Sequence, residues 1–376
     1  MRVFFLLTFA TLTLFAQNKP ELILPVGHKD NVKSADFSPD GNLLLTSSWD
    51  NTAKLWDTKS GRLLRNIVGH KKQLNGAYFN KDGTKFLTYG WDHSVKIWET
   101  SSGKLLHDLF IDTVSISGAE FSPDGKLVLV TGYEGIINVW DANKGTVVFP
   151  LKGQYGTIEC GKFSPDGKLI VTLSWDRTAK IWDASTGNLL VTVPNEADWP
   201  LKTGFSGNSK YFFTTAMNGS VKLWETKTGK LIQNMRGKPD SENMAAFSPD
   251  SKYLVTFNQG DTVEIWETAS GKKKNEITYF LEDPGNICNL AFTPDGSKLV
   301  VSYLHANPVV WDMSTLGMAY FVDAMSSLVG ATGISKDGKM AAFGDYNGRV
   351  ISYDLEKGAL IREFKGGTAS VRSAGV

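Results

Sequence analysis

Aromatic residues recur along this chain at a nearly constant interval, within segments whose apolar and polar positions alternate. One series consists of Phe37, Phe79, Phe121, Phe163, Phe205 and Phe247, spaced 42 residues apart, then Phe292 after 45 residues and Ile334 after another 42. A second series with the same steps consists of Trp56, Trp98, Trp140, Trp182, Trp224, Trp266, Trp311 and Tyr353. Alternation with a period of two predicts short strands, and no segment has the periodicity of a helix. Eight copies of one strand-rich unit therefore make up most of the chain.

Two kinds of turn separate the strands of each unit. The Phe is followed by a version of Ser-Pro-Asp-Gly, as in Ser38–Gly41, where Pro presets φ and Gly supplies a left-handed conformation. The Trp is followed by an acidic residue and a later Gly, as in Asp57–Gly61, which favours a tight hairpin. Two apolar strands lie between these turns, Leu43–Ser47 and Thr52–Trp56 in the first unit. A period near 40 residues with four short strands is typical of a propeller blade.

The residues around these turns resemble the WD40 repeat family. The resemblance rests on Gly27-His28, the Phe-Ser-Pro-Asp-Gly turn and Leu55-Trp56-Asp57, and it covers residues 21–376. It implies a closed ring of four-stranded blades that presents its faces to partner molecules and usually has no catalysis of its own.

The resemblance also implies a structural tetrad in each blade: a buried network of a His, a hydroxyl residue, an Asp and the Trp that ends the third strand. The sets that fit are His28, Thr46, Asp50 and Trp56 in unit one, His70, Thr88, Asp92 and Trp98 in unit two, and Thr172, Asp176 and Trp182, with Gln154 in place of His, in unit four. The departures are Asp112, Val130 and Glu134 in unit three, Glu196 and Asn218 in unit five, and Lys238 and Gly260 in unit six. Losing one member leaves a buried group unpaired, at a cost of ~1–3 kcal/mol. We expect units one and two to be the stiffest and units five to eight to rely on packing.

The predicted fold is therefore an all-β WD40 β-propeller of eight four-stranded repeats. The repeats end near residues 56, 98, 140, 182, 224, 266, 311 and 353. Half a unit is left over, because Glu21–Val26 resembles the outer strand Leu63–Val68 and Gly366–Val376 resembles the inner strand Gly27–Phe37. Since rings of this kind close by pairing strands from both ends, we favour an eight-bladed ring with a loose or doubled closing strand. The alternative is a seven-bladed ring plus the start of a second propeller.

Residues 1–16 have the composition of a signal peptide. A single charge, Arg2, precedes an apolar run from Val3 to Phe15. About 13 apolar or small residues suit a signal-peptide core and fall short of the roughly 20 that span a membrane; the alternative is a buried first strand. We expect cleavage near Ala16, leaving residues 17–376 as an exported, periplasmic or extracellular propeller of bacterial type. No later stretch is apolar enough to predict a membrane span.

Composition and motifs argue against several classes of chemistry. The 40 Lys and Arg against 39 Asp and Glu give a net charge of +1, which argues against a nucleic-acid partner. Five His and two Cys show no metal-site spacing, and no nucleophile elbow, phosphate loop or calcium loop occurs. Cys160 and Cys288 lie three units apart, so we expect no disulfide. Exported quinone-binding propellers share the acidic hairpin turn, but here the Trp four residues after its Gly is missing. We predict no catalytic residue, no metal and no cofactor.

Six aromatic residues are the candidate partner-binding residues: Trp49, Trp91, Tyr133, Trp175, Trp199 and Tyr346. All but Trp199 stand one residue before the Asp position of the tetrad, and Trp199 leads into the inner strand of unit five. In the family this position lies on the top face, around the mouth of the central channel. The rings could lie flat and shield the tetrad, dock a protein or peptide, or stack on a sugar.

Two functions follow from this interpretation. The first is a non-enzymatic exported scaffold that binds a protein or peptide partner through the aromatic top face. The alternative is a sensor or regulatory propeller within a longer chain that carries a C-terminal effector, such as a peptidase domain.

Overall fold

The computed structural model describes residues 27–111, 115–194, 199–236, 245–258, 262–278, 287–303, 306–323 and 329–364. The expected signal peptide and the two spare strands at the chain ends lie outside these residues. The described part is built from β-strands, with one short 3-10 turn, η1 (Tyr133–Gly135).

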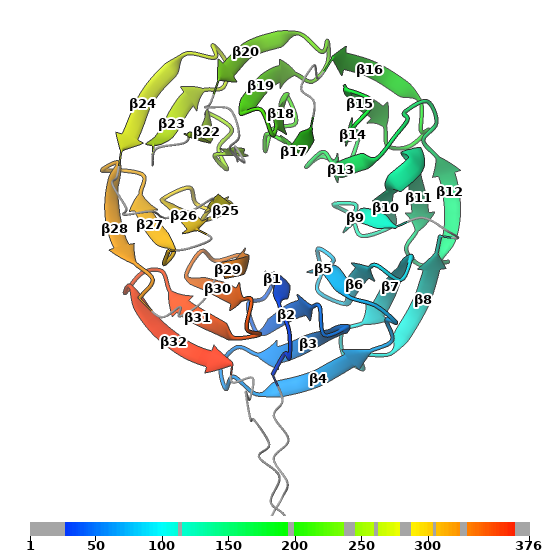
Figure 1. The fold of residues 1–376 in the computed structure, drawn as a ribbon, viewed down its shortest axis with the longest axis vertical. Coiled ribbons are helices and arrows are strands. Elements are labelled where there is room, and N and C mark those ends of the chain that lie inside the picture. The colour runs from blue at the N-terminus through cyan, green and yellow to red at the C-terminus, as the bar shows by residue number, and fades with distance from the viewer. Residues whose placement is uncertain are drawn as a thin grey trace, which may run out of the picture.

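Eight antiparallel sheets of four strands each form a ring of blades (Figure 1). Blades 1 to 4 are β1 (Val32–Phe37), β2 (Leu43–Ser48), β3 (Thr52–Asp57), β4 (Leu63–Val68); β5 (Leu74–Phe79), β6 (Lys85–Gly90), β7 (Ser94–Glu99), β8 (Leu105–Phe110); β9 (Ile116–Phe121), β10 (Leu127–Gly132), β11 (Ile137–Asp141), β12 (Thr146–Pro150); β13 (Ile158–Phe163), β14 (Leu169–Ser174), β15 (Thr178–Asp183), β16 (Leu189–Pro194). Blades 5 to 8 are β17 (Pro200–Phe205), β18 (Tyr211–Ala216), β19 (Ser220–Glu225), β20 (Leu231–Arg236); β21 (Ala245–Phe247), β22 (Tyr253–Asn258), β23 (Thr262–Glu267), β24 (Lys273–Thr278); β25 (Ile287–Phe292), β26 (Lys298–Tyr303), β27 (Val309–Asp312), β28 (Gly317–Phe321); β29 (Val329–Ile334), β30 (Met340–Asp345), β31 (Val350–Asp354), β32 (Ala359–Phe364).

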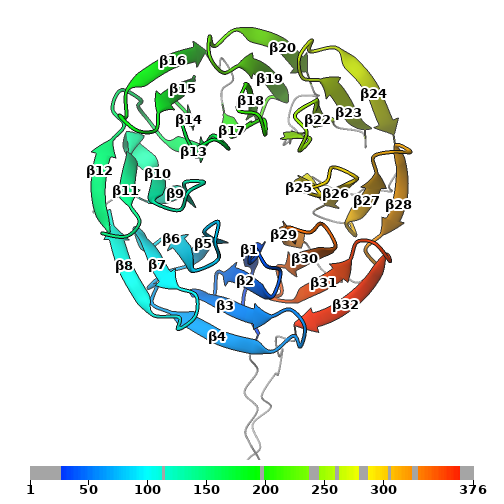
Figure 2. The same cartoon turned by 180° about the vertical axis from the view of Figure 1, so that it is seen from behind.

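Within each blade the strands run from the axis of the ring to its rim in chain order (Figures 1 and 2). The prediction of an eight-bladed, four-stranded propeller is confirmed. The alternative of a seven-bladed ring is wrong, because β29 to β32 form a complete eighth sheet beside blade 1.

The hydrophobic core lies between consecutive blades. Leu45 and Leu55 of blade 1, for example, share one buried cluster with Phe86 and Trp98 of blade 2. The central strands β2 and β3 are almost continuously buried because neighbouring blades cover both of their faces. Outer strands such as β4 are mostly exposed, with Ile67 as the buried residue of β4, since the rim of the ring meets solvent. Each blade therefore depends on its two neighbours for most of its core.

The Ser-Pro-Asp-Gly turns have the geometry that their residues predict. In the first of them, Ser38 Oγ donates to Asp40 Oδ1 at 2.5 Å, and the Gly41 N–H donates to the Ser38 carbonyl at 2.8 Å. Gly41 has a φ of 72°, in the left-handed region that favours Gly. The turn thus fixes the hairpin that joins the inner strand to the second strand.

Side-chain packing between blades 8 and 1 closes the ring. Phe364, at the end of β32, is fully buried in one cluster with Val32 and Trp56. Its ring meets the Trp56 indole edge-on, with the centroids 5.6 Å apart. Arg362 Nη2 also donates to the Lys59 carbonyl at 2.9 Å. The chain reaches β32 as the outer strand of blade 8. The last described sheet therefore consists of four consecutive strands, like the other seven.

This closure predicts a large effect at Phe364. We expect Phe364→Ala to lower the free energy of unfolding by about 3–5 kcal/mol, because it empties a packed site at the seam. The control is Leu360→Ala, a residue of the same strand that is 46% exposed and should change stability by less than about 0.5 kcal/mol. Urea denaturation followed by tryptophan fluorescence measures both variants. Equal effects of the two substitutions would contradict closure through Phe364.

Candidate functional site

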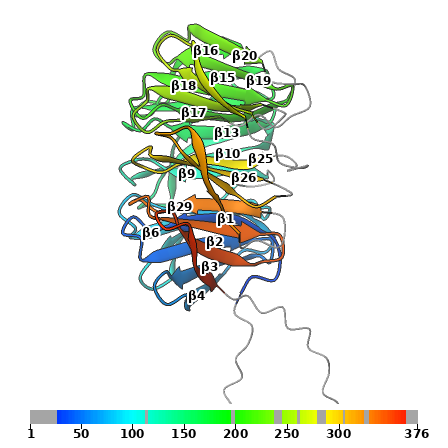
Figure 3. The same cartoon turned by 90° about the vertical axis from the view of Figure 1, so that its left-hand side faces the viewer.

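The antiparallel topology separates the connections of every blade onto two faces of the ring. The turn after β1 and the turn after β3 lie on one face, which we call the lower face. The turn between β2 and β3 and the loop from β4 to β5 lie on the other, the upper face. Figure 3 shows the ring edge-on, with the strands running across its thickness from one face to the other. By this topology, all six candidate aromatic residues lie on the upper face.

A chain of hydrogen bonds joins the core of blade 1 to its upper face. Trp56 Nε1 donates to Thr46 Oγ1 at 2.9 Å, and Thr46 Oγ1 lies 2.8 Å from His28 Nε2. On the other side of the imidazole, His28 Nδ1 lies 2.9 Å from Asp50 Oδ2. Because the Asp50 carboxylate can only accept, Nδ1 carries the imidazole proton and donates it to Asp50, and Nε2 of the neutral ring accepts from the Thr46 hydroxyl.

Blade 2 repeats this arrangement with almost the same distances. Trp98 Nε1 donates to Thr88 Oγ1 at 2.9 Å, and His70 lies 2.7 Å from Thr88 Oγ1 and 2.8 Å from Asp92 Oδ1. The structure therefore brings together all eight residues that the sequence assigns to the tetrads of units one and two.

The electrostatics of the network suit a neutral imidazole beside an ionised carboxylate. Burial lowers the pKa of His28, although the neighbouring Asp50 works against this shift. Burial alone would raise the pKa of Asp50, but the hydrogen bond from His28, with others from Thr52 and the Lys29 N–H, holds that pKa well below its usual range. At neutral pH the pair is a neutral donor and a charged acceptor.

The tetrad also holds the loops of the upper face together. Asp50 Oδ2 accepts the Lys29 N–H at 2.9 Å, and the Trp49 N–H donates to the Asn31 carbonyl at 3.0 Å. These bonds join the turn that carries Trp49 to the loop that leads into β1. A structural network in the core thus sets the position of an aromatic residue on the surface.

The other blades keep parts of this network. In blade 4, Thr172 donates to Gln154 Oε1 at 2.5 Å and accepts from Trp182 at 2.8 Å, while Asp176 accepts the Tyr155 N–H at 3.1 Å. In blade 3, where Val130 replaces the hydroxyl residue, Trp140 Nε1 is buried and has no hydrogen-bond partner. Asp112, Glu196, Lys238 and Gly260 lie outside the described residues.

Two Trp–Thr pairs were not singled out from the sequence. Trp224 donates to Thr214 at 3.1 Å in blade 5, and Trp266 donates to Thr256 at 3.0 Å in blade 6. The spacing of 10 residues between hydroxyl and Trp could have revealed both. These blades therefore retain one hydrogen bond of the network in addition to their packing.

We call the six candidate aromatic residues of the upper face the aromatic sector. Trp91 and Tyr133 are each 39% exposed, Trp175 is 41% exposed and Trp199 is 49% exposed, whereas Trp49 is half-buried. Trp175 and Trp199, from blades 4 and 5, meet edge-on with their ring centroids 4.7 Å apart. Tyr133 lies in η1, the 3-10 turn that joins the second and third strands of blade 3 in place of the turn found there in the other blades with a sector residue.

The polar edges and faces of several rings are held by residues of the inner strands. Trp91 Nε1 donates to Asn75 Oδ1 at 3.0 Å. At the seam of the ring, the Lys33 ammonium lies over Trp49 at 5.0 Å and over Tyr346 at 5.8 Å from the ring centroids. These contacts fix the rings in place while leaving much of their surface exposed.

Two more residues extend the exposed apolar surface of the upper face. Met217, 41% exposed, takes the repeat position of the sector aromatics in blade 5, and Tyr155, 73% exposed, follows Gln154 in the loop before β13. The 42-residue spacing could have revealed Met217. Tyr155 has no equivalent in the other repeats, so the spacing gives no signal for it.

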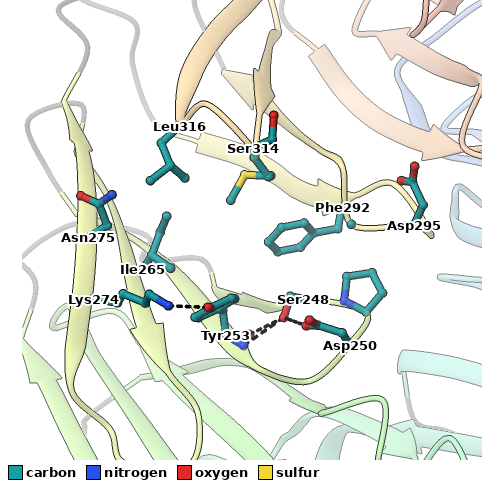
Figure 4. A pocket seen from close by; sticks show the side chains of 13 residues that line it. Ser248, Asp250, Tyr253, Ile265, Lys274, Asn275, Phe292, Asp295, Ser314 and Leu316 are labelled. Atoms are coloured by element: carbon teal, nitrogen blue, oxygen red, sulfur yellow. Dashed lines mark hydrogen bonds between the residues drawn. The ribbon is translucent and has the colours of Figure 1, made fainter.

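The lower face contains a pocket between blades 6 and 7 (Figure 4). It has a volume of about 320 Å³ and is lined by Tyr253, Phe292 and Leu316, among others. Lys274 Nζ donates to Tyr253 Oη at 2.7 Å across one wall. The pocket belongs to the gap between neighbouring blades and lies opposite the aromatic sector.

The described residues offer little other chemistry. They contain no group of three His, Cys, Asp or Glu side chains arranged to hold a metal ion. Cys160 is a free thiol, and burial raises its pKa to about 12; the side chain of Cys288 lies outside the described residues. In the part of the chain that the structure describes, no helix is long and apolar enough to cross a membrane.

Comparison with known proteins identifies the repeats. The model of the family "WD domain, G-beta repeat" matches residues 19–57, 61–99, 103–141 and 145–183. Each match ends at the acidic residue that follows the tetrad Trp, as at Asp57. These four repeats, in the first half of the chain, match the WD40 repeat family.

Single repeats of eukaryotic proteins and one designed protein are similar to this chain. Ribosome assembly protein 4 of Chaetomium thermophilum is 42% identical over 41 residues, 11% of this chain and 8% of that protein. COMPASS component SWD3 of Saccharomyces cerevisiae is 48% identical over 42 residues, 11% of this chain and 13% of that protein. The matches thus span about a tenth of either relative. The crystal structure of the computationally designed Ika8 protein covers 88% of this chain and 98% of its own with a TM-score of 0.77 and 24% identity, which shows the fold alone.

The network predicts unequal effects of removing a hydroxyl from different blades. We expect Thr46→Val to lower the free energy of unfolding by about 2–5 kcal/mol, because both Trp56 and His28 lose a buried partner. Thr214→Val removes only the hydrogen bond from Trp224 and should cost about 1–3 kcal/mol. Urea denaturation compares the two near-isosteric variants. A loss at Thr46 no larger than the loss at Thr214 would contradict a cooperative role of the tetrad.

Proposed function

We propose that this protein is a non-enzymatic scaffold that binds a protein or peptide partner through the aromatic sector. The observation that carries the proposal is the partial exposure of Trp91, Trp175 and Trp199 on one face, each held by contacts with its own or the adjacent blade. Aromatic side chains that are exposed but already ordered lose little conformational freedom on binding, and for this reason they make effective interface anchors. WD40 propellers are generally interaction scaffolds without catalysis of their own, which fits this role.

The relatives support this class of function without identifying the partner. One is a component of a complex and the other takes part in the assembly of a particle, according to their names. Both functions depend on contacts with other macromolecules. Since the similarity is confined to about one repeat, only the general role as an interaction scaffold is carried over to this chain.

Removal of the exposed indoles tests the proposal. We expect the triple variant Trp91→Ala, Trp175→Ala and Trp199→Ala to lose at least 90% of the peptides that the wild-type protein retains from a random linear display library. Its melting temperature should fall only slightly, because these rings lie outside the core clusters. Trp49 is left in place because it is half-buried, so its removal would also disturb packing.

The matched control removes three exposed apolar residues from the outer strands: Leu64→Ala, Leu190→Ala and Leu360→Ala. This variant should retain the same peptides as the wild-type protein. Loss of binding in the control, or full binding by the triple variant, would contradict the aromatic sector as the docking surface. A sector that retains immobilised oligosaccharides and no peptides would favour sugar stacking instead.

We also propose that the protein is exported after cleavage near Ala16, on the strength of the apolar run in residues 1–16. The eukaryotic relatives lend no support to the expectation of an exported, bacterial-type member. N-terminal sequencing of the protein expressed in a bacterial host tests this point. A periplasmic product that begins at Gln17 is the expected result, and an uncleaved cytoplasmic product would contradict it.

A further inference from the structure

The turn that follows the third strand of a blade packs against the outer strand of the preceding blade. Five residues after the strand-ending Trp or Tyr, seven of the eight blades have a Gly: Gly61, Gly103, Gly145, Gly187, Gly229, Gly271 and Gly358. Each has a positive φ, and a Cβ built on any of them would lie 3.0 Å or less from a side chain of the preceding blade. At this turn the neighbouring blades therefore leave no room for a side chain.

Blade 7 departs from this pattern. Leu316 stands at the position of the Gly, with a φ of 54°. A bulky residue rarely adopts this left-handed conformation, so the turn is strained. The side chain of Leu316 lines the pocket between blades 6 and 7, which has a volume of about 320 Å³ (Figure 4). The turn of blade 7 thus places an apolar side chain where the other blades have none.

The outer strand of blade 6 departs from the repeat at the same pocket. Eight residues after the strand-ending Trp or Tyr, the other seven blades have an apolar residue: Leu64, Leu106, Val148, Leu190, Ile232, Ala319 and Ile361. Blade 6 has Lys274 there, and Lys274 lines the same pocket as Leu316. A cavity between blades 4 and 5 has Leu190 at this position instead. Two unusual residues, one from each of two neighbouring blades, therefore meet at one pocket.

Lys274 and Tyr253 form a pair of donors on the wall that blade 6 provides (Figure 4). Lys274 Nζ donates to Tyr253 Oη at 2.7 Å and lies 4.9 Å from the centre of the tyrosine ring. This hydrogen bond is the main cause of a raised pKa of Lys274, so the ammonium is charged at neutral pH. Because Oη accepts this bond, its own hydrogen can go to a third group, and the ammonium has further hydrogens to donate. A carboxylate can accept from both groups together, in charge-assisted hydrogen bonds.

Much of the remaining lining is apolar. Ile265 is buried, and Phe292, Met313 and Leu316 are partly buried against the apolar cluster that blades 6 and 7 share. Pockets for small molecules have volumes of roughly 300–1,000 Å³ and combine apolar walls with a few polar groups that orient the ligand. This pocket lies at the small end of that range, which suits one ring or a short hydrocarbon chain.

We propose that the pocket between blades 6 and 7 is a second binding site, which takes a small organic acid with one carboxylate and an apolar body. The carboxylate accepts from Lys274 and Tyr253, and the apolar body contacts Phe292 and Leu316. Because the pocket opens on the lower face, opposite the aromatic sector, this site is separate from the proposed docking of a peptide.

Two carboxylates of the protein also line the pocket, and each has partners near it in the chain. Asp250 pairs with Lys252 Nζ at 3.1 Å, and Asp295 accepts from Thr293 Oγ1 at 2.6 Å. The hydrogen bond from Lys274, by contrast, goes to a neutral phenol. An incoming carboxylate therefore gains most at Lys274, on the wall that blade 6 provides.

Two substitutions separate the cation from the cavity. Lys274→Leu removes the ammonium and gives blade 6 the residue of blades 1, 2 and 4. Leu316→Gly gives blade 7 the turn residue of the other blades and removes an apolar wall of the pocket. Both restore the pattern of the repeat, so the melting temperature should stay close to that of the wild-type protein. The matched control is Lys272→Leu, which removes an exposed Lys that does not line the pocket.

The probe is 3-phenylpropionate, with 3-phenylpropionamide as its neutral counterpart and acetate as a carboxylate without an apolar body. The methionine methyl groups are labelled with carbon-13, and the resonance of Met313, which lines the pocket, is assigned with Met313→Leu. In the wild-type protein, 3-phenylpropionate should shift this resonance with a Kd of about 1 mM or lower. The amide should bind about tenfold more weakly, as expected for the loss of one charged hydrogen-bonded contact. Acetate should leave the resonance unchanged.

The variants decide between a site for an acid and an apolar gap. Lys274→Leu should bind the acid and the amide equally, Leu316→Gly should bind neither, and Lys272→Leu should behave as the wild-type protein. Equal binding of acid and amide by the wild-type protein, or a preference for the acid that survives in Lys274→Leu, overturns the inference. So does a Met313 resonance that shows no saturable shift with 3-phenylpropionate. None of these outcomes affects the test of the aromatic sector, which uses other residues on the opposite face.

Discussion

The indole of the Trp that ends the third strand of a blade takes part in both the apolar packing between blades and the hydrogen bonding within a blade. Its rings provide apolar surface for the packing of one blade against the next, as where Trp56 meets Phe364 across the seam. Its N–H begins the hydrogen-bonded chain that runs through Thr46 and His28 to Asp50. Apolar burial supplies most of the stability of such a core but has no direction, whereas the hydrogen bonds are directional. The combination fixes both the distance between blades and the position of the loops above them.

The consequence for the candidate site is that hydrogen bonds from the core of a blade fix the position of the loops on the upper face. Asp50 follows Trp49 directly in the chain, so a network that holds the carboxylate also holds the backbone of the aromatic residue. Blade 3 shows the converse: without a hydroxyl at Val130, Trp140 lacks its partner, and the turn above it is η1, with Glu134 in a left-handed conformation at a φ of 58°. Tyr133 is therefore presented by a different backbone from that of its counterparts. The residues of the aromatic sector are therefore held in place by different sets of contacts.

The repeat spacing explains how much of this structure could be predicted from sequence. A residue at a fixed distance from a tetrad Trp has a fixed place in the blade, so the members of the network and the common face of the sector residues followed from counting. Counting favoured eight blades but left a seven-bladed ring open, because closure depends on whether β32 or another segment completes the last sheet. That choice is decided by packing, through the burial of Phe364 against Val32 and Trp56. Nor could counting show that Trp49 Nε1 lacks a hydrogen-bond partner, because the spacing gives the place of a residue in its blade and not the direction of its indole N–H.

A repeat protein also allows differences between equivalent positions to be interpreted as chemistry at nearly constant geometry. Trp49 and Trp140 are two described residues whose indole N–H lacks the acceptor that equivalent positions in other blades provide, and the two stand in different parts of their blades. Trp140 Nε1 is buried beside the apolar cluster that blades 2 and 3 share, so its missing hydrogen bond is a cost in stability that packing offsets. Trp49 Nε1 is buried as well, but its residue stands in a turn of the upper face, where the Lys33 ammonium lies over the indole ring. The same loss of an acceptor therefore affects the packed interior in one blade and a turn of the upper face in another.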